Sequence, residues 1–86
     1  MKSIVKLYMR QRCHLCEEAK EMLEDLQQNW EFEIVEVDID QDDRLVEAYG
    51  ITIPVIEVDG EEVQAGIIHK KSIIEAFSRK NMNFIS

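Results

Sequence analysis

The sequence predicts a small α/β domain with a four-stranded mixed sheet flanked by three helices, in the order β-α-β-α-β-β-α. Apolar runs rich in β-branched residues alternate with segments of helical periodicity, and Asp59-Gly60 separates two strand-like runs. The 86 residues are 45% hydrophobic and include one proline and three glycines, which is enough for one core and leaves no linker-like stretch. The prediction is a single domain over residues 1–86.

The N-terminal half has the pattern of a βαβ unit. Residues 3–9 are an apolar run of strand length, and residues 32–37 are a second one. Between them a helix is expected from Leu15 to about Gln28, because apolar residues recur on one helical face. These residues are Leu15, Ala19, Met22, Leu23, Leu26 and Trp30. Since a helical crossover joins parallel strands, the two strands should pair in parallel.

The C-terminal half predicts a short helix, a hairpin and a last helix. Aspartates that can cap a helix precede a short helical pattern, which Gly50 is expected to end. Residues 51–58 and 61–63 flank Asp59-Gly60, the strongest short signal for an antiparallel hairpin. The last helix is predicted over residues 70–79, with an apolar stripe facing inward. The residues expected to face solvent are Lys70, Lys71, Glu75 and Lys80.

The net charge of −8, from 18 acidic and 10 basic residues, is expected to repel phosphate backbones and anionic membrane surfaces. Neither nucleic acid nor a membrane is therefore expected as a partner. Lys6 interrupts the first apolar run before it reaches signal-peptide length, and no stretch is long enough to cross a bilayer. We expect a cytoplasmic monomer. In that reducing compartment, two close cysteines favour catalysis or metal binding over a structural disulfide.

Cys13-His14-Leu15-Cys16 contains the only two cysteines, and it lies where the first strand gives way to the first helix. A thiolate, and not a thiol, attacks a disulfide, and the unpaired N–H groups at a helix start favour an anion. Cys13, just ahead of the helix, is therefore predicted to be the attacking sulfur. Cys16, inside the first turn and more buried, is predicted to resolve the mixed disulfide. The motif predicts a thiol-disulfide redox site.

Charged residues beside the cysteines are candidates for lowering the pKa of Cys13. Arg10 and Arg12 put two cations just before it, although either could equally be a solvated loop residue. A protonated His14 would stabilise the thiolate, and the alternative is an exposed turn residue. Arg12, His14 and Leu15 flank the cysteines and are also predicted to contact a substrate.

Four segments carry a resemblance to a known family. They are Leu7-Tyr8, Cys13-His14-Leu15-Cys16-Glu17-Glu18-Ala19-Lys20, Tyr49-Gly50-Ile51-Thr52-Ile53-Pro54-Val55 and Asp59-Gly60. With them the chain resembles small glutaredoxin-like proteins of the dithiol CxxC type, within the thioredoxin-fold superfamily. The resemblance spans nearly the whole chain. It implies the thioredoxin fold and a thiol-disulfide oxidoreductase that takes part in electron transport and cell redox homeostasis.

Pro54 has a particular place in this resemblance. X–Pro bonds are mostly trans, and a proline at a strand start needs no special role. In the thioredoxin fold, however, the matching proline is cis and faces the CxxC motif. The resemblance therefore implies a cis bond between Ile53 and Pro54, and a substrate groove lined by Thr52, Ile53, Pro54 and Gly66.

The resemblance also implies partners. Protein disulfides or small thiols are the expected substrates, and the reductant is glutathione or a thioredoxin-reductase-like protein. No tightly bound cofactor is expected beyond the redox-active Cys13-Cys16 disulfide. Glutathione-using members carry a Gly-Gly pair and an aspartate at the start of the last helix. Here residues 64–71 keep only Gly66 and have no acid, and Leu15 replaces the usual aromatic residue, which argues against glutathione.

Two other classes of function stay open. Cys13, Cys16, His14 and His69 have the atom types of a zinc site, but their spacing does not match zinc-finger ligands, so no metal is predicted. A metal cluster shared by two subunits would need Cys13 and bound glutathione. A non-catalytic binding module would instead hold a partner with its acidic surface, or with an apolar groove near Ile53 and Ile67.

Overall fold

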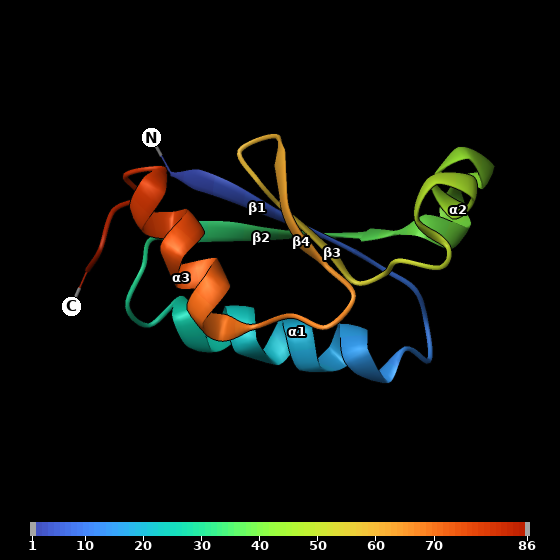
Figure 1. Cartoon of the computed structure of the whole chain (residues 1–86), viewed down its shortest axis with the longest axis horizontal. Coiled ribbons are helices and arrows are strands. Elements are labelled where there is room, and N and C mark those ends of the chain that lie inside the picture. The colour runs from blue at the N-terminus through green and yellow to red at the C-terminus, as the bar shows by residue number, and fades with distance from the viewer. Residues whose placement is uncertain (1, 86) are drawn as a thin grey trace.

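The computed structural model describes residues 2–85, so the two ends of the predicted domain, Met1 and Ser86, lie outside the described residues. The elements are β1 (Ser3–Met9), α1 (His14–Leu26), β2 (Phe32–Asp38), the 3-10 helix η1 (Ile39–Gln41), α2 (Asp43–Tyr49), β3 (Val55–Val58), β4 (Glu61–Ala65) and α3 (Lys70–Arg79). The strands and α-helices follow one another in the predicted order (Figure 1), which confirms the predicted fold class.

The four strands form one sheet in the order β2-β1-β3-β4. β1 pairs in parallel with β2 and antiparallel with β3, and β3 pairs antiparallel with β4, so the sheet is mixed as predicted. Tyr8, near the carboxyl end of β1, lies opposite Val55, the first residue of β3. The loop that leaves β1 and the loop that enters β3 therefore meet at one end of the sheet.

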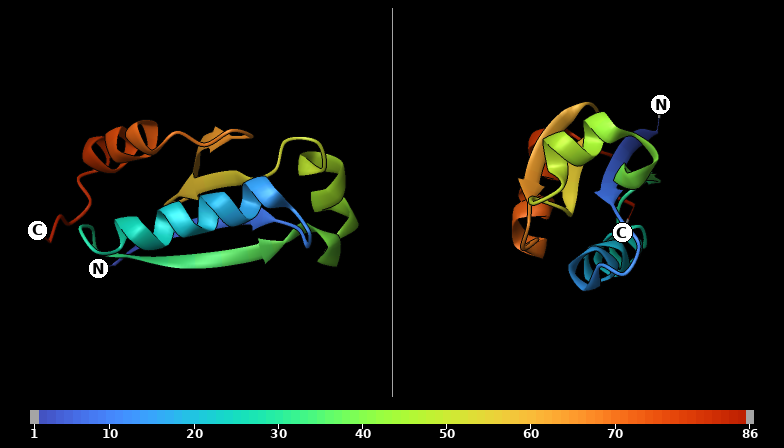
Figure 2. Two further views of the ribbon diagram at one scale, coloured as in Figure 1. Left: turned by 90° about the horizontal axis from the view of Figure 1, so that it is seen from below. Right: turned by 90° about the vertical axis from the view of Figure 1, so that its right-hand side faces the viewer.

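The main core lies between one face of the sheet and the two longer helices, α1 and α3 (Figure 2). Val5 and Leu7 of β1 and Ile56 and Val58 of β3 point toward these helices, because alternate residues of a strand share a face. All four side chains are fully buried. Burial of one such side chain contributes about 1.5–3 kcal/mol, so this layer supplies much of the stability of a small domain.

α2 and η1 cover part of the opposite face. Tyr8, Ile39 and Val55 form a second buried cluster there, and the ring centroids of Tyr8 and Tyr49 lie 4.7 Å apart. The Tyr8 hydroxyl donates a hydrogen bond to Glu57 at 3.2 Å. Burial, followed by the negative charge of Glu57, raises the pKa of Tyr8 above its ordinary value. These contacts hold α2 at the end of the sheet where the two loops meet.

The end of α1 and the start of β3 differ from the expected element boundaries. α1 ends at Leu26, two residues early, and β3 begins at Val55 and not at residue 51. The backbone N–H groups of Thr52 and Ile53 both donate to the Tyr49 carbonyl, at 2.9 and 3.1 Å. Residues 50–53 are therefore a turn after α2, which keeps them out of the sheet.

The predictions for two turns had different outcomes. Asp59 and Gly60 have φ angles of 47° and 91°, as the two-residue hairpin requires. Gly50 ends α2 as predicted, but its φ of −52° is not left-handed. A Cβ atom at position 50 would lie 2.5 Å from the carbonyl oxygen of Val46. Glycine is needed there because of this close approach and not because of an unusual backbone angle.

α3 has the predicted bounds and the predicted buried stripe, with Ile73 and Phe77 fully buried. Lys80, just after it, differs from the expectation that it faces solvent. Its side chain is only 20% exposed, and its Nζ lies 2.7 Å from the Glu61 carboxylate. This hydrogen bond from Lys80 lowers the pKa of Glu61. The pair ties the end of α3 to the start of β4.

Candidate active site

Cys13 is the N-cap residue of α1, with an extended backbone, and its sulfur accepts a hydrogen bond from the backbone N–H of Cys16 at 3.2 Å. The first N–H groups of a helix have no partner within the helix, so a side chain at the N-cap can accept from them. The two cysteines form a disulfide, and their Cα atoms lie 5.2 Å apart. When the disulfide is reduced, the same donor is available to a thiolate on Cys13.

The two sulfur-bearing residues differ in exposure. Cys16 is 3% exposed, whereas Cys13 is half-buried. A bulky partner that approaches from solvent therefore meets Cys13 first. The division into attacking and resolving sulfur remains a prediction, and this geometry agrees with it.

The buried stripe of α1 contains three of the residues predicted for it and, in addition, Cys16. It consists of Cys16, Ala19, Leu23 and Leu26. Leu15, predicted to face inward, is 44% exposed, and Met22 is only partly buried, so both lie at the margin of the stripe. Cys16, in the first turn of the helix, lies on the buried face. The consequence is an aliphatic side chain at the surface between the two cysteines.

Pro54 lies at the same end of the sheet as the cysteines, since it directly precedes Val55. The peptide bond between Ile53 and Pro54 is cis, which confirms the expectation. Pro54 is buried, and its carbonyl accepts a hydrogen bond from the N–H of Gly66 at 2.8 Å. Gly66 has a φ of 79°, a value that favours glycine. This bond joins two residues that were predicted to line the substrate groove.

The other two predicted groove residues have contacts on the α2 side. The Thr52 hydroxyl donates to the carbonyl of Tyr49 at 3.3 Å. Ile53 is half-buried and packs against the second core cluster, the one that contains Tyr8 and Val55. Their role in substrate binding remains a prediction.

Arg10 and Arg12, which the sequence could not distinguish, have different surroundings. Arg10 binds Asp40 through two hydrogen bonds, with Nη2 at 2.7 Å and Nε at 3.3 Å. The hydrogen bond raises the pKa of Arg10 and lowers that of Asp40. Arg12 is exposed, has a φ of 57°, and has no recorded ion pair within residues 2–85. A neighbouring carboxylate therefore offsets the positive charge of Arg10, whereas the positive charge of Arg12 has no such partner among the described residues.

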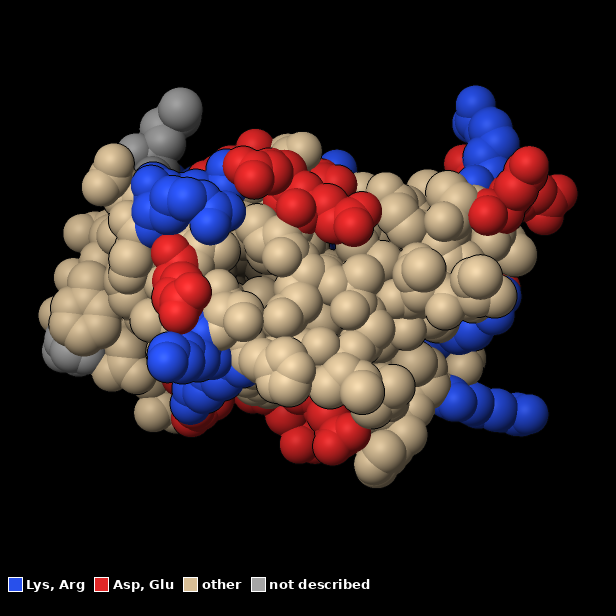
Figure 3. Space-filling view, in the orientation of Figure 1, with Lys and Arg blue, Asp and Glu red and all other residues tan. Residues whose placement is uncertain are grey.

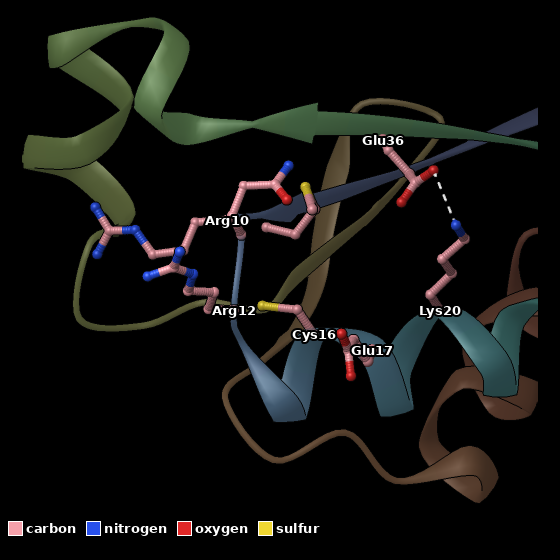
Figure 4. A pocket seen from close by; sticks show the side chains of 8 residues that line it. Arg10, Arg12, Cys16, Glu17, Lys20 and Glu36 are labelled. Atoms are coloured by element: carbon pink, nitrogen blue, oxygen red, sulfur yellow. Dashed lines mark ion pairs between the residues drawn. The ribbon is translucent and has the colours of Figure 1, made fainter.

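A cavity of about 250 Å³ lies beside Cys16, between the end of β1, β2 and the first turns of α1 (Figure 4). It is lined by Met9, Arg10, Gln11, Arg12, Cys16, Glu17, Lys20 and Glu36. Lys20 and Glu36, which lie 3.4 Å apart, were not predicted as site residues. The parallel register pairs Glu36 with Leu7 and so turns it toward α1, where Lys20 lies one turn after Cys16. The pairing register of β1 with β2 is the feature from which Lys20 and Glu36 could have been predicted as neighbours of the cysteine pair.

A second cavity, of about 140 Å³, lies on another side of the start of α1. Leu15, Glu18, Ala19 and Met22 of α1 line it together with Ile67 and Ile68, from the loop between β4 and α3. Leu15 was predicted to contact substrate, and Ile67 was named in the binding-module alternative. The remaining lining residues were not predicted.

His14 is 85% exposed, and its Nε2 lies 3.7 Å from the carboxylate of Glu18. The imidazole carries a positive charge in this pair only when it is protonated. Both readings of His14 stay open. Within residues 2–85 no group of three or more His, Cys, Asp or Glu side chains is placed to hold a metal ion. None of the described helices is both long and apolar enough to cross a membrane.

Comparison with solved structures places the chain among similar folds. Protein Ne2328 from Nitrosomonas europaea is 27% identical, with a TM-score of 0.78, and the match covers 88% of this chain and 92% of that one. Target protein XcR50 from X. campestris is 29% identical, with a TM-score of 0.74 and coverage of 87% and 96%. A mutant thioredoxin from Halobacterium salinarum is 19% identical, with a TM-score of 0.68 and coverage of 91% and 74%, and it shares the fold.

Comparison with curated proteins gave no match. The model of one protein family, described as glutaredoxin-like domain (DUF836), matches residues 4–80. That range contains the cysteine pair, Pro54 and Gly66, and it covers nearly the whole chain. The chain therefore belongs to the glutaredoxin-like domain family.

Proposed function

We propose that the protein is a thiol-disulfide oxidoreductase that uses Cys13 and Cys16 as a redox-active dithiol. The observation that supports this most directly is the hydrogen bond from the N–H of Cys16 to the sulfur of Cys13, at the start of α1. A donor in that position stabilises a thiolate, which is the reactive form. The exposed cation Arg12 has the same effect on a neighbouring negative charge.

The reaction begins when the Cys13 thiolate attacks one sulfur of a substrate disulfide. A bond forms between Cys13 and that sulfur, the substrate S–S bond breaks, and the other substrate sulfur leaves as a thiolate that takes up a proton. Cys16 then loses its proton and attacks the sulfur of Cys13. The Cys13-Cys16 disulfide forms, and the second substrate sulfur leaves and is protonated. Two electrons have passed from the dithiol to the substrate, and the two substrate thiols have taken up one proton from Cys16 and one that Cys13 had released to solvent when it ionised.

A reductant must return two electrons and two protons before the next turnover. We propose a dithiol protein, such as one of the thioredoxin-reductase-like kind, in preference to glutathione. The reason is the segment before α3, where apolar Ile67 and Ile68 stand and no acid is present to bind the amino group of a γ-glutamyl end. The substrates are proposed to be disulfides of proteins or small thiols in the cytoplasm, where such a reductant is maintained.

Covalent trapping tests this function. The Cys16→Ser variant keeps the attacking sulfur but cannot release the mixed disulfide. We expect it to trap substrate proteins from a cell extract, and a reducing agent should release them. Cys13→Ser is the matched control and should trap none. If Cys16→Ser traps nothing and the reduced wild-type protein reduces no protein disulfide, the proposal is wrong and a non-catalytic binding module is favoured.

A further inference from the structure

The smaller cavity forms an apolar notch that includes Leu15, the residue just before Cys16. We use "apolar notch" for the surface formed by Leu15, Ala19, Met22, Ile67 and Ile68. Leu15 lies between the two cysteines in sequence, so the notch begins at the reactive site. Leu15 is 44% exposed and Ile67 is 68% exposed. The notch is therefore open to solvent and available to a molecule bound at Cys13.

Two segments that are far apart in sequence form the notch. Leu15 and Met22 come from the margin of the α1 stripe, whereas Ile67 and Ile68 come from the loop that joins β4 to α3. Single exposed aliphatic residues are common on protein surfaces, but a contiguous hollow built from two segments suggests a binding site. Figure 3 shows a broad face without charged side chains in the middle of the view, with acidic side chains above and below it and basic side chains at its left and right edges.

The lining of the notch carries negative charge alone, and the cations Lys70 and Lys71 follow it at the start of α3. Glu18 is the only charged residue in its lining, and its carboxylate is 58% exposed. The nearest cationic partner recorded for it is His14, at 3.7 Å, which is charged only when protonated. Lys70, near the same loop, is already bound to Asp25. With a net charge of −8 on the whole chain, a basic ligand is favoured here and an acidic one is opposed.

We propose that the apolar notch binds an aliphatic side chain of a protein substrate, and that Glu18 pairs with a neighbouring Lys or Arg of the same segment. The inference rests on the proposed function and names its substrate class, a protein disulfide flanked by an aliphatic and a basic residue. The volume of about 140 Å³ suits one aliphatic side chain and is too small for a folded element. Glutathione has no aliphatic side chain, and its two carboxylates outweigh the single charge of its amino group.

Single-turnover reduction of peptide disulfides by the pre-reduced wild-type protein tests the proposal. The peptides share one sequence except at two positions next to the cysteine, which carry Leu-Lys, Ser-Lys, Leu-Glu or Ser-Glu. We expect the Leu-Lys peptide to react about tenfold faster than the Ser-Glu peptide, with the other two between them. Hydroxyethyl disulfide, which lacks side chains, reports on the thiol chemistry alone.

Variants assign the preference to named residues. Ile67→Ser should reduce the preference for Leu, and Glu18→Gln should reduce the preference for Lys. The rate of each variant with hydroxyethyl disulfide measures its thiol chemistry, and the peptide rates are compared after division by it. Ile85→Ser is the control, because Ile85 has a similar exposure of 56% and lies near the carboxyl terminus. It should change neither the preference for Leu nor the preference for Lys. Because Ile67 and Glu18 are exposed, the variants are expected to fold.

The outcomes distinguish an error in the proposed substrate class from an error in the proposed function. Equal rates with all four peptides, or a faster rate with the acidic ones, would overturn the substrate class while leaving the oxidoreductase intact. A wild-type protein that is a dimer, and that Ile67→Ser converts to a monomer, would also overturn it, because a second copy would then cover the notch. Failure to reduce any disulfide, hydroxyethyl disulfide included, would overturn the proposed function itself.

Discussion

The backbone N–H of Cys16 donates a hydrogen bond to the sulfur of Cys13 at 3.2 Å, while the side chain of Cys16 faces the core. The contact favours negative charge on one sulfur of the pair and leaves the other buried, at 3% exposure. The sulfur that a substrate can reach is thus also the sulfur that the helix start favours as an anion.

Neutralising Arg12 should raise the pKa of Cys13 more than neutralising Arg10. Asp40, at 2.7 Å, already balances the charge of Arg10, whereas no ion pair is recorded for Arg12 among residues 2–85. Ultraviolet titration of the thiolate in Cys16→Ser, alone or combined with Arg12→Gln or Arg10→Gln, measures the difference. The pKa of Cys13 itself is expected below the free-cysteine value of about 8.5. Equal effects of the two substitutions would contradict the balancing role of Asp40.

Glutathione should support only weak turnover of hydroxyethyl disulfide. The loop before α3 presents Ile67 and Ile68 and lacks an acid that could hold the amino group of glutathione. A dithiol reductant such as dithiothreitol needs no such contacts, so it should regenerate the protein at a comparable concentration. The measurement is the steady-state rate with each reductant. Robust turnover with glutathione would show that the missing acid and glycine are not needed for it to bind.

Two surface ion pairs should contribute to stability at neutral pH and not in acid. Hydrogen bonds from Arg10 and Lys80 lower the pKa values of Asp40 and Glu61 in the folded protein. A carboxyl group whose pKa is lower in the folded than in the unfolded state stabilises the fold above its unfolded pKa. That stabilisation is lost as the pH falls through the folded pKa. Because both groups are exposed, the effects should be small.

Urea unfolding across pH measures these pairs. The midpoints of Asp40→Asn and Glu61→Gln should lie below that of the wild type at about pH 7, and the differences should shrink as the pH falls below about 4. Glu62→Gln removes a neighbouring charge with no recorded ion pair and should behave like the wild type throughout this range. Differences that persist in acid would mean that the substitutions act through packing and not through charge.

Phe77→Ala should cost about 3–5 kcal/mol of unfolding free energy, because Phe77 is fully buried in the main core. Its ring centroid lies 5.6 Å from that of Trp30 and 5.0 Å from that of Phe32. Phe84→Ala is the matched control, since Phe84 also touches Trp30 but is 57% exposed, and it should cost about 1 kcal/mol. Urea unfolding of both variants measures the difference, and equal costs would contradict the assignment of the core.

The order of the elements could be predicted because each has a local signal. The helical spacing of apolar residues in α1 and α3 and the Asp59-Gly60 turn depend only on neighbours in sequence. The start of β3 could not be predicted in this way. Residues 51–53 have strand-like side chains, but their N–H groups bond to Tyr49 at the end of α2, and Pro54 follows with a cis bond.

The cysteine pair could be predicted because its chemistry is contained in four consecutive residues. The surroundings of the pair could not, because tertiary structure assembles them. Ile67 meets Leu15 only after α3 packs beside α1, and Glu36 approaches Lys20 only through the register of β1 with β2. The distinction between Arg10 and Arg12 likewise depends on Asp40, which lies thirty residues away from Arg10.

Mass spectrometry of a single turnover tests the dithiol mechanism most directly. Pre-reduced wild-type protein, mixed with one equivalent of a peptide disulfide, should end as the internal Cys13-Cys16 disulfide with both peptide thiols released. Under the same conditions Cys16→Ser should stop as a peptide adduct on Cys13. Wild-type protein that remains fully reduced beside intact peptide disulfide, or an adduct located on Cys16, would contradict the mechanism.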